Sequence, residues 1–316
     1  MGFDLEALRH AVKTQGRVAR VVIAEINGSS PREVGAAMLI SAEAQSGTIG
    51  GGALEYEATK HARQALGRPQ NADRLSHHAL GPDLGQCCGG RVTLLREIYD
   101  AERVSLLDPH VIARAPVGTE KPLAVARLLD QHRGAGQTPD PQLVQGWMVE
   151  PVHRPMLPLW IWGAGHVGRA LIDVLAPLPD LAITWVDTHA DRFPSAPHPR
   201  VTCVPAAKPE TLMAHAPTEA HHLILTYSHD LDLALCHASL LRGFASAGVI
   251  GSATKWARFK RRLTELGHDM PKIQQIACPI GDPALGKHPT AIAVGVAAAL
   301  LTAQQGQIAT IGEQRA

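Results

Sequence analysis

Residues 159–168 read LWIWGAGHVG, and RALI follows directly at 169–172. A buried-strand pattern that passes through a G-x-G-x-x-G turn into a helix is the context that the dinucleotide-binding fingerprint requires. Each glycine has its own role: Gly163 permits the tight turn, and Gly165 lets the backbone approach a diphosphate. Gly168 lets the helix pack closely on the strand. The N-terminus of such a helix offers unpaired N–H groups to an anion.

An acidic residue stands where this fingerprint expects one. Asp187 closes the apolar run 182–186 and follows Gly168 by nineteen residues. At that place in the fold a carboxylate meets a ribose hydroxyl. We interpret His166, inside the glycine turn, as a residue that orients the loop or caps the ligand pocket. The succession of strand, glycine turn, helix, second strand and terminal acidic residue predicts half of a Rossmann-like domain.

Strand and helix patterns alternate through the C-terminal half. We expect strands at 159–162, 182–187, 201–204, 222–226, 247–250 and 273–278. This alternation is typical of a parallel sheet covered on both faces, with ligands beyond the carboxyl ends of the strands. The predicted fold class is α/β: a Rossmann-like doubly wound parallel sheet at 156–316 and a mixed α+β domain at 1–155, joined by a Pro-rich linker.

The N-terminal half carries mixed signals. Helical spacing appears at 4–14, 53–66 and 123–132, and strand patterns at 18–26, 36–40, 91–98, 111–112 and 145–151. Glycine-rich turns separate several of these elements. The stretch 100–155 gives the weakest signals.

The composition is that of an ordinary globular protein, with 45% hydrophobic residues, 19% charged residues and a net charge of +1 over 316 residues. This length favours two domains. The charge predicts no attraction to nucleic acid or to acidic membranes. The basic run 255–262 alternates with apolar residues, as on a solvated helix face, and the apolar stretch 291–303 is too short to span a bilayer.

The cysteine content bears on the compartment. Five cysteines, an odd number, do not suggest a disulfide framework and point to a reducing environment. The first residues lack the basic and apolar regions of a signal peptide. We therefore expect a cytoplasmic protein, and a homodimer as the commonest soluble assembly.

Seven short segments span nearly the whole chain outside 100–155. They are GSSPR at 28–32, GTIGGGALE at 47–55, QCCGG at 86–90, WGAGHVG at 162–168, TYSHDLD at 226–232, IGSATK at 250–255 and CPIG at 278–281. In this order they resemble the XdhC/CoxI family, the xanthine dehydrogenase accessory proteins. One departure is Tyr227, where we expect a histidine in many relatives, so a role for that histidine does not carry over.

The resemblance implies a function. Proteins of this family are described as cytoplasmic chaperones that bind the molybdenum cofactor (molybdopterin), hold it for sulfuration and insert it into xanthine dehydrogenase. They also meet a cysteine desulfurase that supplies the sulfur. An accessory factor of this kind is a carrier rather than an enzyme.

The adjacent thiols Cys87 and Cys88 are the candidate catalytic or molybdenum-contacting residues. Neighbouring Cα atoms lie about 3.8 Å apart, closer than in disulfides, and the C-x-x-C spacing of structural zinc sites is missing. One thiol could contact molybdenum or take part in sulfur transfer, for which soft thiolates are suited. Alternatively, both are small residues packed under a glycine turn; the family resemblance favours a function.

The glycine-rich loops of the N-terminal half could form a second anion site. Ser30 and Arg32 offer a hydroxyl and a planar guanidinium, and Gly51 and Gly52 stand just before a predicted helix. Glu55 would lie in the first turn of that helix and stabilise its dipole. From sequence alone, two tight turns with an exposed arginine explain the pattern more often.

Polar residues also follow two later strands of the predicted sheet. His229 and Asp230 could act as acid–base groups or contact the amide and amine edge of a pterin, although Asp230 or Asp232 could instead cap a helix. Ser252 with Lys255 resembles a helix-opening phosphate contact, and a surface lysine is the alternative. Apolar contexts place Cys203 and Cys236 in the core. Cys278, before Pro279 at the end of the last strand, is expected to be a small buried residue.

Two rival functions stay open at this point. The fingerprint at 163–187 also fits an NAD(P)-dependent oxidoreductase, in which Asp187 would favour NAD over NADP; another nucleotide could occupy the same crevice. The vicinal cysteines fit a sulfurtransferase that carries a persulfide on Cys87 or Cys88.

Overall fold

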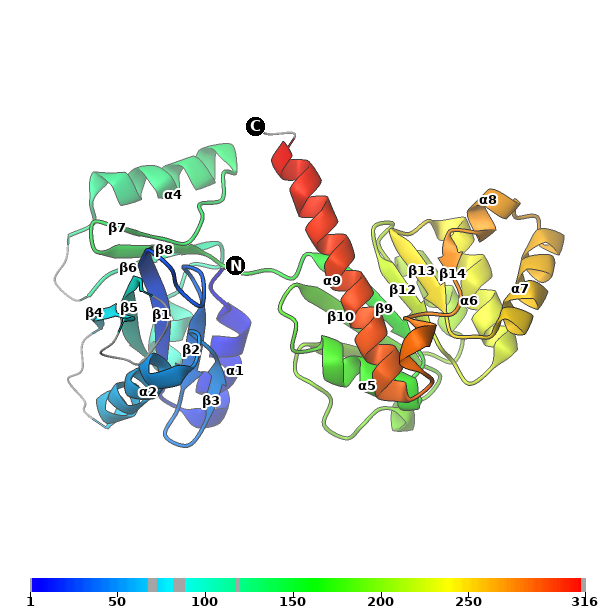
Figure 1. Cartoon of the computed structure of the whole chain (residues 1–316), viewed down its shortest axis with the longest axis horizontal. Helices are drawn as coiled ribbons and strands as arrows, with labels where there is room; N and C mark the ends of the chain where they lie inside the picture. The colour runs from blue at the N-terminus through cyan, green and yellow to red at the C-terminus, as the bar shows by residue number, and fades with distance from the viewer. Residues whose placement is uncertain (1, 68–72, 82–88, 117–119, 314–316) are drawn as a thin grey trace. The chain divides into compact units, whose positions relative to one another are not determined.

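The computed structural model describes residues 2–67, 73–81, 89–116 and 120–313, the last ten of these as backbone only. The chain divides into two compact units, Met1–Arg154 and Pro155–Ala316. Each unit has its own hydrophobic core. We describe them separately (Figure 1).

The C-terminal unit is built on a six-stranded sheet in which every recorded pairing is parallel. Its strands are β9 (Leu157–Trp162), β10 (Leu181–Asp187), β11 (Val201–Pro205), β12 (His221–Ile224), β13 (Ser246–Val249) and β14 (Ile276–Ala277). They lie in the order β11-β10-β9-β12-β13-β14. Numbered within the unit this is 3-2-1-4-5-6, the order of a Rossmann fold, so the predicted fold class is confirmed.

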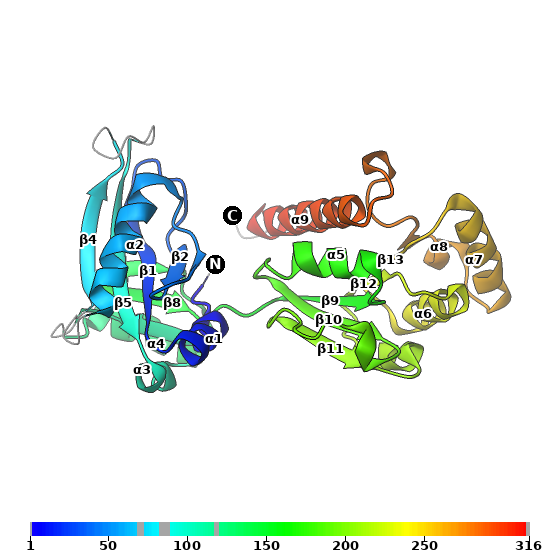
Figure 2. The ribbon, with the colours of Figure 1, turned by 90° about the horizontal axis from the view of Figure 1, so that it is seen from below.

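Helices cover both faces of this sheet. They are α5 (His166–Leu175), α6 (His229–Arg242), α7 (Ala253–Glu265), α8 (Met270–Ile273) and α9 (Pro289–Glu313). Figure 2 shows α5 and α9 on the same side of the sheet, where both contribute to one core cluster with β9 and β10. The cluster on the opposite face includes residues of α6 and α7. No helix in the described part of the chain has the length and apolar content needed to cross a bilayer.

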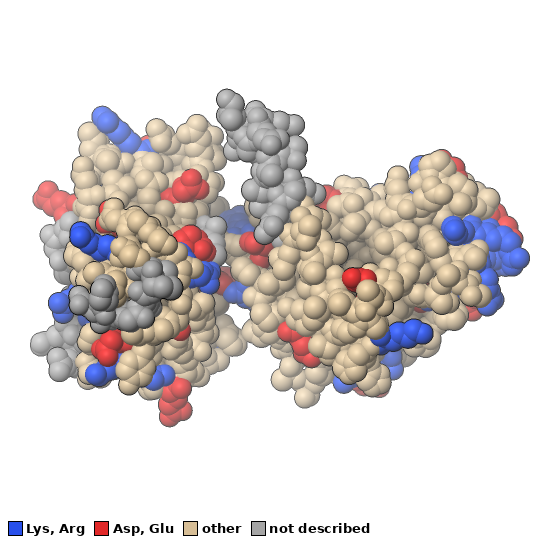
Figure 3. Space-filling view, in the orientation of Figure 1, with Lys and Arg blue, Asp and Glu red and all other residues tan. Residues whose placement is uncertain are grey.

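The basic run 255–262 lies on α7, as the pattern predicted. Phe259 and Leu263 face the core, with 5% and 0% of their surface exposed, while Arg258 and Arg261 are exposed. Figure 3 shows the resulting group of basic side chains over α7. This arrangement is an amphipathic helix with a solvated charged face.

The N-terminal unit combines two antiparallel sheets with helices. One sheet has the order β3-β2-β1-β5-β4 and the other β6-β8-β7. The strands are β1 (Val18–Asn27), β2 (Ala37–Ile40), β3 (Gln45–Gly47), β4 (Arg74–Ala79), β5 (Arg91–Tyr99), β6 (Val111–Arg114), β7 (Gln142–Val144) and β8 (Trp147–Pro151). The helices are α1 (Leu5–Gln15), α2 (Gly52–Leu66), α3 (Ala101–Ser105) and α4 (Leu123–Ala135).

Several element boundaries differ from those predicted. The strand expected at 145–151 begins only at Trp147, because Gln145 and Gly146 have φ of +50° and +82° and form the turn of the β7–β8 hairpin. The strand expected at 273–278 is only β14, since α8 occupies the residues up to Ile273. The polar strands β3 and β4 were missed, because they carry no clear apolar alternation.

Four charged side chains join the two N-terminal sheets inside the core. Arg20 and Arg114 are 3% and 7% exposed, and Glu97 and Glu150 are fully buried. Arg20 donates to both Glu150 oxygens at 2.8 and 3.0 Å, and Arg114 Nε donates to Glu97 at 2.5 Å. Both guanidinium groups also lie against the ring of Phe3, at 4.2 and 4.8 Å from its centroid. The network therefore ties β1, β5, β6 and β8 together.

Candidate functional site

The glycine turn of the C-terminal unit has the geometry that its sequence predicted. Gly163 has φ of +122°, and a Cβ atom there would overlap the carbonyl of Leu225, which directly follows strand β12. A Cβ atom on Gly168 would overlap the carbonyl of Gly163. Both positions therefore require glycine, one for the turn and one for the close approach of α5 to β9.

The N-terminus of α5 is open at this turn. Its N-cap is Gly165, which supplies no side-chain cap, and a Cβ atom there would meet no described atom within 4 Å. His166, the first residue of the helix, is exposed. The first N–H groups of α5 thus lie beside open space at the carboxyl edge of the sheet, where the helix dipole favours an anion.

Asp187 is used by the protein itself. Its side chain is 4% exposed; Oδ2 accepts from the backbone N–H of Ala164, and Oδ1 accepts from the N–H and hydroxyl of Thr188 at 2.6 and 3.1 Å. Arg192 Nε lies 3.5 Å from the same Oδ1. The carboxylate holds the glycine turn in shape, and in this conformation its oxygens do not face an open ribose site.

A buried ion pair closes the next strand end. Asp232 is fully buried and accepts from Lys255 Nζ at 2.6 Å, while its other oxygen accepts from the N–H and hydroxyl of Thr226 at 2.9 and 2.8 Å. Lys255 also donates to the carbonyl of Ile250 at 2.8 Å. Lys255 is therefore not a surface lysine, and its ammonium is paired with Asp232. The phosphate contact expected at Ser252 and Lys255 stays a prediction.

Other polar residues at this edge are more accessible. His229 and Asp230 are exposed in the first turn of α6, whose N-cap is Ser228 rather than either aspartate considered from sequence. Ser252 caps α7 and accepts from the N–H of Lys255 at 3.2 Å. Its hydroxyl thus serves the helix end, while the pair at the start of α6 is free to meet a ligand.

The described cysteines pack as expected. Cys236 is fully buried, and Cys203 and Cys278 pack against the two core clusters of the C-terminal unit. Burial raises the pKa of all three thiols; Asp232 adds to this for Cys236 and Cys278, while Lys255 lowers the pKa of both. A raised thiol pKa disfavours the reactive thiolate.

The glycine-rich segments of the N-terminal unit converge although they are far apart in sequence. A Cβ atom on Gly90 would overlap the carbonyl of Ser29, and one on Gly28 would lie 3.2 Å from Gly90 Cα. On Gly50 it would lie 2.5 Å from Pro31 Cγ. The loops 28–32 and 47–52 and the end of the QCCGG motif therefore form one assembly of close backbone contacts.

The predicted anion cradle in this assembly already holds an anion. Glu55 Oε2 accepts from the hydroxyl of Thr48 at 2.5 Å and from the N–H groups of Ile49 and Gly51 at 3.0 and 3.1 Å. Burial raises the pKa of Glu55, but these hydrogen bonds lower it by more, so the net shift is downward. Glu55 thus satisfies the turn that precedes α2, whereas the N-cap residue Gly51 supplies no side-chain cap to the first N–H groups of the helix. The phosphate contact expected at Gly51 and Gly52 stays a prediction.

The structure also describes the surroundings of Arg32 and Ser30, which were predicted as anion contacts. Arg32 donates to the neighbouring carboxylate of Glu33 at 3.2 Å. The Oγ of Ser30 is buried and has no hydrogen-bond partner within the described residues.

Cys87 and Cys88 lie outside the described residues, so the predicted molybdenum contact is not located. Elsewhere in the described chain, no group of three or more His, Cys, Asp or Glu could hold a metal ion.

Strand order, glycine turn and open helix end define a two-unit protein whose C-terminal unit is a Rossmann domain. Residues 159–300 match the family model of the XdhC Rossmann domain, and residues 11–77 match that of the XdhC and CoxI family. The chain belongs to the XdhC and CoxI family. No curated protein matches it.

A solved structure shares this fold over nearly the whole chain. The chain is similar to a structure described as a xanthine dehydrogenase from Bacillus halodurans, with 18% identity, 96% of each chain covered and a TM-score of 0.66. An NADP complex of a short-chain dehydrogenase/reductase (wide type) from Veillonella parvula DSM 2008 has 17% identity over 38% of this chain and 59% of that chain, with a TM-score of 0.26. The NAD+ complex of the Bordetella bronchiseptica enzyme WbmH has 15% identity over 30% and 38%, with a TM-score of 0.23. The last two likenesses are too partial to bear on the ligand.

Proposed function

We propose that this protein binds the molybdenum cofactor, holds it for sulfuration and inserts it into xanthine dehydrogenase. Membership of the XdhC and CoxI family supports an accessory role toward that enzyme. The cofactor itself is cargo, a pterin that carries a dithiolene and a phosphate. A protein that carries it needs an anion site, partners for the amide edge and a place for the metal.

The observation that carries this proposal is the open N-terminus of α5. Its backbone N–H groups have no side-chain cap, and a Cβ atom on Gly165 would meet no described atom within 4 Å. A phosphate there would accept from these groups in the field of the helix dipole. His229 and Asp230, exposed at the start of α6, would hydrogen-bond the pterin edge.

The environment of Asp187 argues against the oxidoreductase alternative. An NAD enzyme of this fold directs its carboxylate at the ribose hydroxyls. Here both carboxylate oxygens accept hydrogen bonds from the turn and from Thr188, and the side chain is 4% exposed. An uncapped helix end without the matching ribose contact supports a phosphate-bearing guest other than NAD.

The test is a change of charge at the helix end. Gly165→Asp places a preferred N-cap residue at α5, so we expect stability to be kept or raised. The added carboxylate satisfies the same N–H groups and repels a phosphate, so cofactor affinity should fall by at least about a hundredfold. Gly165→Asn is the matched neutral variant and should lose less. Mass spectrometry of released cofactor and reactivation of cofactor-free xanthine dehydrogenase measure the outcome.

Two results would contradict the proposal. One is unchanged cofactor binding and transfer in Gly165→Asp. The other is micromolar binding of NAD or NADH in calorimetry together with substrate-dependent absorbance at the nicotinamide band, which would instead support the oxidoreductase.

The thiols have a separate test. If Cys87 or Cys88 contacts the metal, alanine at both positions should weaken cofactor binding, and unchanged binding and transfer would exclude that role. Intact-mass analysis after incubation with a cysteine desulfurase and cysteine would reveal a persulfide, the intermediate of the sulfurtransferase alternative.

A further inference from the structure

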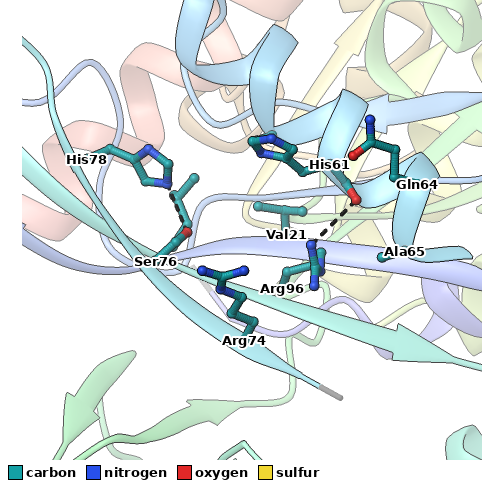
Figure 4. Close-up of a pocket in the computed structure, with 10 residues that line it drawn as sticks. Val21, His61, Gln64, Ala65, Arg74, Ser76, His78 and Arg96 are labelled. Atoms are coloured by element: carbon teal, nitrogen blue, oxygen red, sulfur yellow. Dashed lines mark hydrogen bonds between the residues drawn. The ribbon is translucent and has the colours of Figure 1, made fainter. Parts of the chain in front are cut away.

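A cavity of about 440 Å³ lies between helix α2 and strands β4 and β5 of the N-terminal unit (Figure 4). Its polar side chains are those of His61, Gln64, Arg74, Ser76, His78 and Arg96. Apolar side chains of β1, β5 and α2 form the rest of its wall. In Figure 4 the two guanidinium groups lie near each other below the rings of His61 and His78. Four basic side chains from three elements thus share one hollow.

Among the described residues that line this cavity, no carboxylate balances the positive charge. Arg74 stands directly opposite Arg96 in the antiparallel pairing of β4 with β5, an arrangement that destabilises a sheet when both residues carry the same charge. No Asp or Glu is among the lining residues. Arg96 Nη1 donates only to the carbonyl of His61, at 3.4 Å, and its buried Nε has no partner among the described residues.

Other arginines of the same unit are treated differently. Arg20 and Arg114 are paired with buried glutamates, and the half-buried Arg103 is paired with Asp73. The fold therefore supplies a carboxylate wherever these guanidinium groups leave water. The half-buried Arg96 is an exception to that rule, and the exposed Arg74 beside it also lines the cavity.

The pKa shifts of two lining residues agree with a cavity that disfavours additional positive charge. Burial lowers the pKa of Arg96, and Arg74 adds to this effect, against a smaller opposite contribution from Asp73. Burial also lowers the pKa of His78, with contributions from His61 and His77. An anion bound in the cavity would relieve both effects, whereas a metal cation would be repelled.

We propose that this cavity binds the phosphate of a small phosphomonoester between Arg74 and Arg96. Guanidinium groups bind phosphate through paired N–H donors, and two of them match a dianion. His61, Gln64 and Ser76 add hydrogen-bonding groups around it. A volume of about 440 Å³ exceeds the needs of a bare phosphate and is in the range of small-molecule sites. This site is independent of the helix end assigned to the cofactor.

The test uses the full chain carrying Gly165→Asp, so that the helix end of α5 is closed to phosphate. Adenosine 5′-monophosphate, inorganic phosphate and adenosine are titrated by calorimetry at constant low ionic strength, because salt screens such contacts. We expect the monophosphate to bind more tightly than phosphate, and adenosine not to bind. Arg74→Gln and Arg96→Gln should each weaken monophosphate binding by at least about tenfold.

Stability separates a ligand site from a structural role. Because Arg74→Gln removes one of two opposed like charges, the melting temperature of the free protein should be unchanged or raised. Lys60→Gln, the same charge change at an exposed position of α2, is the matched control and should alter binding by less than about twofold.

The proposal is overturned if Arg74→Gln binds the monophosphate as well as its parent, or if Lys60→Gln weakens binding as much. Should Arg96→Gln fail to fold, the exposed Arg74 still decides the question. Equal affinity for phosphate and its ester would contradict the assignment to an ester. Since the helix end is closed throughout, these outcomes do not depend on the proposed cofactor role.

Discussion

At the scale of single residues, three carboxylates determine which predicted sites are open. Glu55, Asp187 and Asp232 each accept hydrogen bonds from turns that sequence patterns mark as ligand contacts. A buried turn needs its N–H groups satisfied, and a carboxylate on a nearby element does this as well as a ligand. The helix end at Gly165 has no side-chain cap, and no described carboxylate accepts from the turn of α5 at that residue.

Glu55 provides a test at this scale. Glu55→Gln removes the charge that four hydrogen bonds stabilise, so we expect a loss of about 1–3 kcal/mol in the free energy of unfolding at pH 7. The pKa of Glu55 is lower in the folded protein than its ordinary value of 4.5. Its stabilisation is therefore complete above that pH and lost as the pH falls through the folded-state pKa.

Urea unfolding of both proteins at a series of pH values measures this difference. It should be large at pH 7 and shrink in acid. Glu43→Gln changes an exposed glutamate of the same unit and should leave the unfolding free energy unaltered. Equal stability of wild type and Glu55→Gln at pH 7 would contradict the assignment.

At the scale of elements, long apolar patterns were predictable and short polar ones were not. Strands β1, β5, β9 and β10 are rich in buried apolar residues, because burial in a sheet selects such residues. β4 reads RLSHHA, a polar sequence that becomes a strand only through pairing with β5. The buried network of Arg20, Glu97, Arg114 and Glu150 leaves no local signal, since its members come from four strands.

That network makes a prediction for element packing. Burial lowers the pKa of Arg114, but Glu150 and Glu97 raise it by more, to well above its ordinary value. Arg114→Met leaves two buried carboxylates with one guanidinium, so we expect a loss of about 3–5 kcal/mol in denaturant unfolding.

Arg133→Met serves as the control, because Arg133 pairs with Asp130 on the exposed surface of α4, at 72% and 67% side-chain exposure. This change should cost less than about 1 kcal/mol. If both substitutions had equally small effects, the network would not hold the sheets together.

At the scale of the whole molecule, two units with separate cores account for the chain. The C-terminal unit has clusters on both faces of its own sheet, and the N-terminal unit has a cluster between α2 and its larger sheet. A unit that buries its own apolar surface can fold by itself.

We therefore expect the fragment 155–316 to fold alone. Its circular dichroism should show a cooperative thermal transition with mixed helix and strand content, and its amides should be protected from hydrogen exchange across β9, β10 and β12. An aggregated or unfolded fragment would show instead that the unit depends on the rest of the chain.

The sequence by itself determined the Rossmann fold, the family and the turn at Gly163, because local spacing and apolar periodicity fix strand, turn and helix. Tertiary structure alone decided which polar groups remain free. Asp187, Lys255 and Glu55 carry the expected chemistry, yet neighbours brought close by folding already satisfy them. Conversely, Arg74 and Arg96 meet only because β4 pairs with β5. Whether a charge is paired depends on contacts between distant segments, which no local pattern records.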